Sequence, residues 1–361
     1  MLAIAVAGGH HGAIPTLNSA MSQPTPKQIR EQQAAVSDVI AAAYGEPPAA
    51  MHPLAQTMSL RAAADLIGRQ LLSEHENPQH AFARGLASSD FGALLAQGAA
   101  PATLATFAQA AEHRAYCDIV SVTSYRPESI RALEGDALPL EPLQELQRMR
   151  ASVLFPGAPG PADVALRTYG RVVGVSRQLV FNGDLAHVLR SLKNVAATAA
   201  RQEAAMLANT METGITMGDG QPMFDAQFKN VHAAALDAAA LGKAIELLRT
   251  QPTSSGQPAG LSARHLIVAP DLEFSARRLV HESGVQIEVQ ALAGLSAGRW
   301  FLLAAPDVCP VIGLLQLEGS RSPVRVEQLN YIFESDVLPI RITADLGCTW
   351  LRRTGVVKGG V

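Results

Sequence analysis

The most informative segment of the chain runs from Asn182 to Glu212 and reads NGDLAHVLRSLKNVAATAARQEAAMLANTME. Apolar residues recur along it at steps of three and four, the pattern of an amphipathic helix; they are Leu185, Val188, Leu189, Leu192, Val195, Ala196, Ala199, Met206 and Leu207. Asn182-Gly183-Asp184 is a capping signal, and Asp184 would favour the positive end of the helix dipole. The pattern predicts one helix over about 184–211, roughly 42 Å long. Because most helices have about ten to fourteen residues, this one predicts an elongated body with a spine.

The segment before this helix is the least regular part of the sequence. Residues 127–166 contain six prolines and show little periodicity, and a structureless segment of that length is uncommon inside a compact domain. We therefore expect either disorder or an excursion that packs against something else. β-branched residues predict a strand on each side: one over 116–123, and a strand pair or bent strand over 168–181.

The N-terminal part of the sequence contains short helical patterns. Residues 1–56 are poor in charge and contain several prolines, and they are typical of an arm or tether with one amphipathic helix. Residues 57–125 predict a helical region that leads into the first strand. Ser59 and Ser88 are expected to cap its helices, and Pro101 is expected to restart helical periodicity.

Beyond the spine, the sequence changes from helix-rich to strand-rich. Of 61 alanines, 55 precede residue 280. Helices are expected over 233–248 and 272–281. Strands are expected over 266–269, 285–289, 300–303, 311–317, 324–326, 332–333 and 338–343. Neither a βαβ alternation nor a fixed-period repeat is visible, so the predicted class is α+β.

The composition excludes several classes of protein. Apolar residues make up 48% of the chain and charged residues 17%, which excludes a disordered chain. The net charge of −3 disfavours a strongly basic nucleic-acid binder. The cations are 24 arginines and five lysines; arginine is the usual choice for interfacial ion pairs, although a GC-rich genome produces the same excess.

The cysteines and the apolar runs bear on the compartment. Cys117, Cys309 and Cys348 are far apart, so they predict free thiols in a reducing cytoplasm instead of a disulfide framework or a metal knuckle. The apolar run at the N-terminus has seven residues, and no later stretch reaches 18 uncharged apolar residues. We expect a soluble intracellular chain with neither a signal peptide nor a membrane span.

One motif could carry chemistry. Gly294-Leu295-Ser296-Ala297-Gly298 fits the G-x-S-x-G nucleophile elbow of serine hydrolases, which needs a strand before the serine and a helix after it. The residues that follow it predict another strand, and all ten histidines lie at or before His281, whereas the triad histidine of that fold follows the serine. We favour a hairpin turn and keep a serine hydrolase as the alternative from another class.

The other reactive side chains form no catalytic pattern. His10-His11 has no third ligand nearby, and His75 and His80 lack the spacing of a zinc-protease helix. No glycine-rich phosphate loop precedes a lysine. We therefore predict no catalytic, cofactor-binding or metal-ligating residues, no cofactor, and a protein that is not an enzyme.

Short motifs occur in a specific order around the spine. Those leading into it are Arg167-Thr168-Tyr169-Gly170-Arg171, Val175-Ser176-Arg177-Gln178 and Asn182-Gly183-Asp184-Leu185. This series resembles the strand-to-spine signature of Mu-like phage major capsid proteins. Further segments similar to that family are Ser88-Ser89-Asp90-Phe91, Tyr125-Arg126-Pro127, Gly218-Asp219-Gly220-Gln221-Pro222-Met223-Phe224, Val268-Ala269-Pro270-Asp271-Leu272-Glu273, Leu317-Glu318-Gly319 and Asp345-Leu346-Gly347. The resemblance covers roughly residues 57–358.

The resemblance implies the Hong Kong 97-type capsid fold, an α+β fold built from an N-terminal arm, an extended loop, a peripheral domain with a long spine helix, and an axial domain. The implied parts are an arm or tether over 1–56, the helical region over 57–125, the extended loop over 126–167, the peripheral domain over 168–230, the axial domain over 231–330, and C-terminal strands over 331–361 that return to the peripheral sheet.

The resemblance also implies a major capsid protein that self-assembles through hexamers and pentamers into the icosahedral shell of a phage head. The implied location is the virion capsid, assembled in the host cytoplasm. Implied partners are the portal, a scaffold or prohead protease, decoration proteins and, without sequence specificity, packaged double-stranded DNA; no membrane is implied. The nearest alternative is a subunit of a non-viral encapsulating compartment of the same fold, and a monomeric binding module is a third.

The residues expected to serve assembly are Arg126, Glu145, Arg148, Arg150, Arg167, Tyr169, Arg171, Arg177 and Asp184. Some capsids of this fold join subunits by an isopeptide bond from a loop lysine. Between Arg126 and Val195 the only lysine is Lys193. We therefore predict that no such bond starts on this loop.

Overall fold

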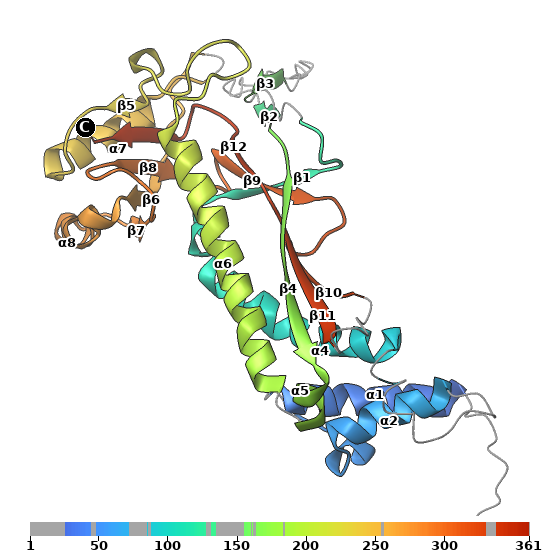
Figure 1. The fold of residues 1–361 in the computed structure, drawn as a ribbon. Helices are drawn as coiled ribbons and strands as arrows, with labels where there is room; N and C mark the ends of the chain where they lie inside the picture. Colours follow the sequence, from blue (N-terminus) through green and yellow to red (C-terminus); the bar gives the residue numbers. More distant parts are fainter. Residues whose placement is uncertain are drawn as a thin grey trace, which may run out of the picture.

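The computed structural model describes residues 26–44, 48–71, 85, 88–127, 131–134, 155–159, 161, 164–182, 185–253, 256–329 and 337–360. The predicted strand at 332–333 and residues 135–154 of the predicted extended loop lie outside these residues. Figure 1 shows an elongated molecule, with one long helix along its length, a group of helices at one end and a sheet domain at the other.

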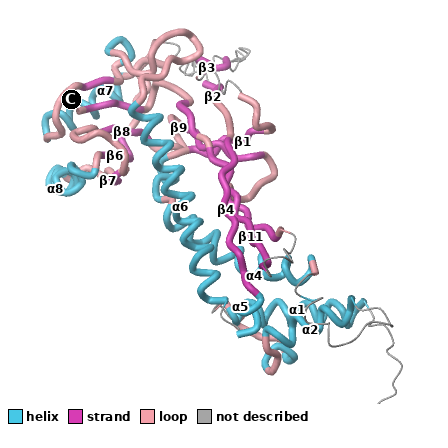
Figure 2. The backbone as a smooth tube through the Cα atoms, viewed as in Figure 1, coloured by secondary structure: helices cyan, strands magenta, loops and turns pink. Residues whose placement is uncertain are grey.

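The helices and 3-10 helices are α1 (Pro26–Ala43), η1 (Pro53–Gln56), α2 (Leu60–Leu71), α4 (Ser89–Ala110), η3 (Glu112–Tyr116), α5 (Arg177–Asn182), α6 (Leu185–Glu212), η4 (Ala226–Phe228), α7 (Ala238–Thr250), η5 (Pro270–Leu272) and α8 (Glu273–Ser283). The strands are β1 (Asp118–Val122), β2 (Arg131–Glu134), β3 (Phe155–Pro159), β4 (Arg167–Ser176), β5 (Val231–His232), β6 (Ala263–Val268), β7 (Glu288–Ala291), β8 (Trp300–Ala304), β9 (Ile312–Leu317), β10 (Val324–Gln328), β11 (Val337–Leu346), β12 (Cys348–Trp350) and β13 (Val356–Gly359). Figure 2 shows how they are distributed, and the α+β class is confirmed.

The predicted spine is confirmed as α6, which lines two hydrophobic cores. Its first half buries Leu185, Leu189 and Leu192 in a core shared with α1, α2, α4 and the β10-β11-β4 sheet. Its last turns bury Leu207 and Met211 in a second core shared with β6, β8 and β9. Because one uninterrupted helix belongs to both cores, it joins the two ends of the molecule as a rigid brace.

Helix α4 is central to the first core and begins as the sequence predicts. The Ser88 side-chain oxygen accepts a hydrogen bond from the Phe91 N–H at 3.1 Å, which satisfies one of the unpaired donors of the first turn. The predicted restart at Pro101 is wrong, because α4 continues through it. A proline removes one backbone donor, and next to it the buried Thr103 hydroxyl donates to the Ala99 carbonyl at 2.7 Å.

Among the described helices, α4 is also the one whose length and composition would allow it to cross a membrane. Its Phe91, Leu95 and Phe107 side chains are buried in the first core. Packing against other elements of the same chain therefore accounts for the apolar character of this helix.

The helix predicted in the N-terminal arm is α1, and it is docked on its own subunit. Val36, Val39 and Ile40 are buried in the first core. The Tyr44 hydroxyl, just after the helix, donates to the Leu95 carbonyl of α4 at 3.0 Å. This apolar face explains why the short helix is held in place although the segment around it contains several prolines.

The sheet β5-β13-β8-β6-β7 is buried on both faces. Helices α7 and α8 cover one face, which presents Leu266, Trp300 and Leu302. The other face presents Ile267 and Phe301 to the second core. Successive residues of β6 and β8 therefore enter different cores, as the two-residue period of a strand requires.

Strand pairing departs from the predicted domain boundaries at the C-terminus. β11 pairs with β4, whereas β13 pairs with β8 and β5 in the other sheet. β10, placed in the axial region from sequence, pairs with β11. Position along the chain does not reveal such long-range pairing, and β12 and β13 were not predicted.

Two local predictions also need correction. The extended stretch ends at Ser176, and Leu179 and Val180 belong to α5 instead of a strand; the Ser176 hydroxyl accepts from the Leu179 N–H at 3.4 Å, as a helix cap does. Helix α7 begins at Ala238, later than predicted, because Asp237 caps it.

Candidate assembly interface

The β10-β11-β4 sheet has one face in the first core and one face turned away from it. Leu338, Ile340 and Ile342 of β11 point into the core. We call the opposite side the outer sheet face; it carries Thr168, Gly170, Val172, Gly174, Arg325, Glu327, Arg341, Thr343 and Asp345. These residues share a face because side chains paired across a ladder point the same way.

Along β4, the outer sheet face carries Thr168, Gly170, Val172 and Gly174 and no large side chain. β4 pairs with β11 on one side only, so it is an edge strand of ten residues. Val172 is 52% exposed there, and the neighbouring Gly170 and Gly174 have no side chain to rise beside it. An edge strand with an exposed apolar side chain is a ready site for association with another chain.

The polar part of the outer sheet face is organised by ion pairs across the strands. Arg341 of β11 pairs with Glu327 of β10 at 2.5 Å. One register step away, Arg325 of β10 pairs with Asp345 of β11 at 2.6 Å. The first pair is about half exposed and contributes little to stability, whereas Asp345 is only 4% exposed.

Asp345 also joins the two ends of the proline-rich segment 127–166, which we call the excursion. The Tyr125 hydroxyl, before the excursion, donates to Asp345 Oδ2 at 3.0 Å, and the Thr168 hydroxyl, after it, donates to Oδ1 at 2.6 Å. Asp345 begins the motif Asp345-Leu346-Gly347, but its sequence neighbours indicate no role for it. Its partners lie up to 220 positions away along the chain, so no local pattern could have revealed the cluster.

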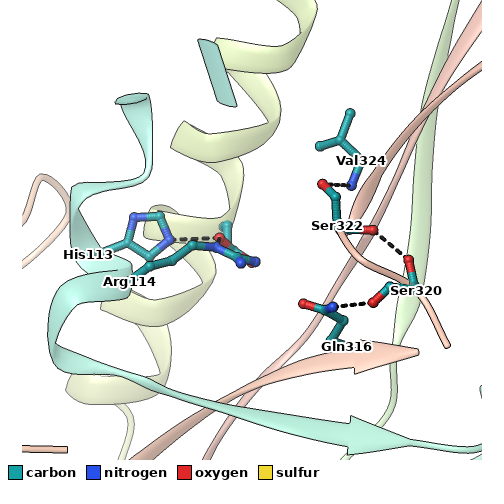
Figure 3. A network of polar contacts seen from close by, with 7 residues as sticks. His113, Arg114, Gln316, Ser320, Ser322 and Val324 are labelled. Atoms are coloured by element: carbon teal, nitrogen blue, oxygen red, sulfur yellow. Dashed lines mark hydrogen bonds and ion pairs between the residues drawn. The ribbon is translucent and has the colours of Figure 1, made fainter. Parts of the chain in front are cut away.

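A second buried carboxylate, Glu203, lies in the middle of α6. Arg114 binds it with two hydrogen bonds, at 2.9 Å and 2.7 Å, and the Nε2 atom of His113 lies 2.9 Å from Oε2. Figure 3 shows His113 and Arg114 projecting from their turn beside this helix. Burial alone would raise the pKa of Glu203, but the hydrogen bonds from His113 and Arg114 outweigh it and leave that pKa below its ordinary value. This network attaches η3, and with it the start of β1, to the spine.

Figure 3 also shows the connection between β9 and β10, which a chain of polar contacts keeps ordered. The Gln316 side-chain amide donates to the Ser320 carbonyl, and the Ser320 hydroxyl donates to the Ser322 carbonyl at 2.6 Å. The Val324 N–H donates to the Ser322 hydroxyl at 3.2 Å, where β10 begins. These contacts position the strand that carries Arg325.

The turn over 294–298 holds the end of the spine. The Ser296 N–H donates to Glu212 Oε1 at 2.8 Å, and Arg299 lies 3.5 Å from the same carboxylate. The turn connects β7 to β8, but these strands are separated by β6 in the sheet, so the predicted hairpin is wrong. Strand β8 follows Ser296 where a nucleophile elbow needs a helix, and the geometry of a serine hydrolase is therefore not formed.

The structure brings part of the predicted assembly set together. Arg167 and Tyr169 line a hollow of about 400 Å³ between β4, the last turns of α6 and β12. Arg171 is exposed farther along β4, and Arg126 is exposed at the start of the excursion. Arg177 lies in α5. Glu145, Arg148, Arg150 and Asp184 lie outside the described residues, which leaves the predicted Asp184 cap untested.

Within the described ranges, no three His, Cys, Asp or Glu side chains gather as a metal site requires. The polar groups that converge there instead tie distant segments of the chain together. The exposed edge strand β4 is the feature of this part of the chain that is open to pairing with another chain.

Comparison with known proteins gives the family. The phage capsid protein family model matches residues 161–359. Because this match covers more than half of the chain, the chain belongs to the phage capsid protein family. It is a major capsid protein, a structural protein of the virion that forms the shell of a phage head.

Several solved structures are similar to this chain. They include a phage-related protein from Bordetella bronchiseptica RB50 (10% identity, TM-score 0.44, 72% of this chain and 96% of that chain), a virus-like particle from Pyrococcus furiosus (10% identity, TM-score 0.46, 73% and 97%) and the head of Helicobacter pylori bacteriophage KHP40 (9% identity, TM-score 0.44, 68% and 86%). The search of curated proteins finds no match.

Proposed function

We propose that copies of this subunit close into hexamers and pentamers through the excursion, with the excursion of one copy lying on the outer sheet face of its neighbour. One observation carries the proposal. Among the described strands, β2 and β3 of the excursion pair only with each other, and neither extends any of the other three sheets of its own subunit. The surface that the excursion contacts would then lie on another copy.

The outer sheet face suits an extended segment. Gly170, Val172 and Gly174 form a strip along the edge strand β4, in which the Val337 side chain packs next to Gly174, and Arg341 and Glu327 offer charged groups next to it. A segment laid along this strip would bury apolar area between chains, which offsets the conformational entropy lost when the segment is ordered. Repeated head-to-tail contacts of one kind close into rings.

The shell formed in this way would enclose double-stranded DNA. A net charge of −3 fits containment better than tight binding, since phosphate contacts from a few arginines give weak, salt-dependent affinity without sequence preference. We further propose assembly in the host cytoplasm, together with a portal, a scaffold or prohead protease and decoration proteins. We also propose that the chain belongs to the Mu-like subgroup of capsid proteins. We propose further that no isopeptide bond between subunits starts on the excursion.

The central experiment compares the full chain with a variant in which residues 135–154 are replaced by a short Gly-Ser linker. Light scattering and negative-stain microscopy measure particle size. We expect rings or shells from the full chain, and folded single subunits from the variant. Shells from the variant would contradict the role given to the excursion, provided that circular dichroism shows both proteins to be folded.

The contents of purified particles separate the phage head from the nearest alternative. Nuclease-protected double-stranded DNA in particles from infected cells supports a head that encloses a genome. A protected cargo enzyme without a genome would instead identify an encapsulating compartment.

A further inference from the structure

We infer that Asp345 is the positioning residue of the excursion, because its single buried carboxylate sets the direction in which the excursion leaves the subunit. The inference rests on the proposed function, since that direction matters only if the excursion reaches a neighbouring copy. It goes further by naming the side chain that controls the geometry of the contact.

The first step is that each oxygen of Asp345 holds a different end of the excursion. Oδ2 accepts from the Tyr125 hydroxyl at 3.0 Å, and Oδ1 accepts from the Thr168 hydroxyl at 2.6 Å. Tyr125 lies just beyond the end of β1, and Thr168 is the second residue of β4. The two ends therefore meet at one group, and they cannot move apart without breaking one of these bonds.

The second step is that this group is itself fixed. Asp345 lies on the central strand β11, its N–H donates to the Pro323 carbonyl at 2.9 Å, and Arg325 Nη2 lies 2.6 Å from Oδ2. The residue is 4% exposed, and a buried charge is tolerated only while donors surround it. Displacing either end of the excursion would leave the charge short of a donor, which makes the arrangement stiff.

The two ends of the excursion are also packed together next to Asp345 by other residues. The role left to Asp345 is therefore to set the direction of the excursion. Val122 and Leu166 form a small separate core with Leu315 of β9. Gly347 packs directly against this small core, since a Cβ at Gly347 would be 3.1 Å from the Ala165 carbonyl oxygen. This core keeps the two ends together without Asp345, whereas the hydrogen bonds to Asp345 fix their orientation on the β10-β11-β4 sheet.

The test is the double variant Tyr125→Phe with Thr168→Val. It removes both hydroxyls, preserves the shape of both side chains, and leaves the Arg325–Asp345 pair in place. Hydrogen exchange of the amides in 118–126 and 164–170 measures how firmly the two ends are held, and negative-stain microscopy measures shell diameters. We expect exchange that is about fivefold to thirtyfold faster in these two segments only, and shells of mixed diameter.

Two controls make the result specific. Glu246→Gln breaks an exposed ion pair with Lys243 on α7, a helix that packs on the other sheet, and should leave exchange and diameters unchanged. Thr168→Ser alone keeps a hydroxyl beside Asp345 and leaves Tyr125 in place, so it should preserve both the exchange rates and the uniform shells.

The outcomes separate the inference from the proposed function. Unchanged exchange, uniform shells, or a loss of protection spread over the whole chain in the double variant would each overturn the role of Asp345. If the unmodified chain forms no shells, the proposed function fails, and the exchange data alone still decide whether Asp345 holds the two ends.

Discussion

At the scale of single residues, Glu203 and Asp345 are the two acidic side chains that are almost fully buried in the described part of the chain. Each joins segments that are distant in sequence, Glu203 across α6 and η3 and Asp345 across both ends of the excursion. A buried ion pair often adds little net stability compared with apolar residues of the same shape, but removing one partner is costly because the other charge remains buried.

Replacing Glu203 tests this asymmetry. Glu203→Gln should lower the free energy of unfolding by about 3 kcal/mol, because Arg114 would lose its charged partner inside the protein. Chemical denaturation measures the change. The control is Arg201→Gln on the same helix, whose side chain is exposed, and it should change stability by less than about 0.5 kcal/mol. Equal effects of the two substitutions would contradict the role assigned to Glu203.

The lowered pKa of Glu203 predicts a pH dependence. Because the pKa is below its ordinary value of 4.5 in the folded protein, the folded state binds fewer protons at this site than the unfolded state. The contribution to stability is therefore complete above about pH 4.5 and is lost as the pH falls toward the folded-state pKa. Unfolding measured from pH 6 downward should show a steeper loss of stability in the unmodified protein than in Glu203→Gln, and parallel curves would argue against it.

At the scale of elements, close packing of backbone against side chain decides how the last strand joins its sheet. Gly359 of β13 faces Trp300 of β8, and a Cβ at Gly359 would lie 2.0 Å from the indole ring. Trp300 is fully buried, and its Nε1 donates to the Ala234 carbonyl at 3.1 Å. Only glycine therefore allows β13 to pair beside this ring.

Gly359→Ala is expected to destabilise the protein by about 3 kcal/mol, since neither the fixed indole nor the paired strand can move aside easily. Thermal unfolding followed by tryptophan fluorescence measures the effect. Gly214→Ala is the matched control, because a Cβ there meets no atom within 4 Å. A Tm for Gly359→Ala as high as that of the control would show that β13 is not packed in this way.

At the scale of the whole molecule, the long brace and the open sheet edge serve different purposes. Helix α6 belongs to both cores and keeps the body elongated, while the outer sheet face offers an exposed strip to another copy. Changes to α6 should alter the stability of the single subunit. Changes to the exposed strip around Val172 should alter assembly alone.

Val172→Lys examines the second purpose. Val172 is 52% exposed, so the stability of the single subunit should change by less than about 0.5 kcal/mol. Shell formation should fall by tenfold or more, because a lysine would be buried without a partner beneath a neighbouring excursion. Sedimentation measures the fraction of assembled protein, and Val172→Thr, which preserves the shape of the side chain, should assemble normally. Normal assembly of Val172→Lys would remove the outer sheet face from the proposed interface.

Features that depend on neighbours along the chain could be predicted from the sequence. The periodicity of residues 185–212 predicted α6 to within a residue at each end, and Ser59 and Ser88 cap α2 and α4 as expected. Caps and helical faces are readable because they involve residues three or four positions apart. The order of short motifs indicated the capsid family in the same way.

The contacts between residues that are distant in sequence could be identified only in the folded chain. Tyr125, Thr168, Arg325 and Asp345 come together at one carboxylate, and the bond from Tyr125 spans 220 positions. β13 joins the far sheet instead of the peripheral one, and the turn at Ser296 binds Glu212 at the end of the spine. Burial and strand pairing depend on the whole chain. A local sequence pattern depends only on residues a few positions apart, so it cannot predict these contacts.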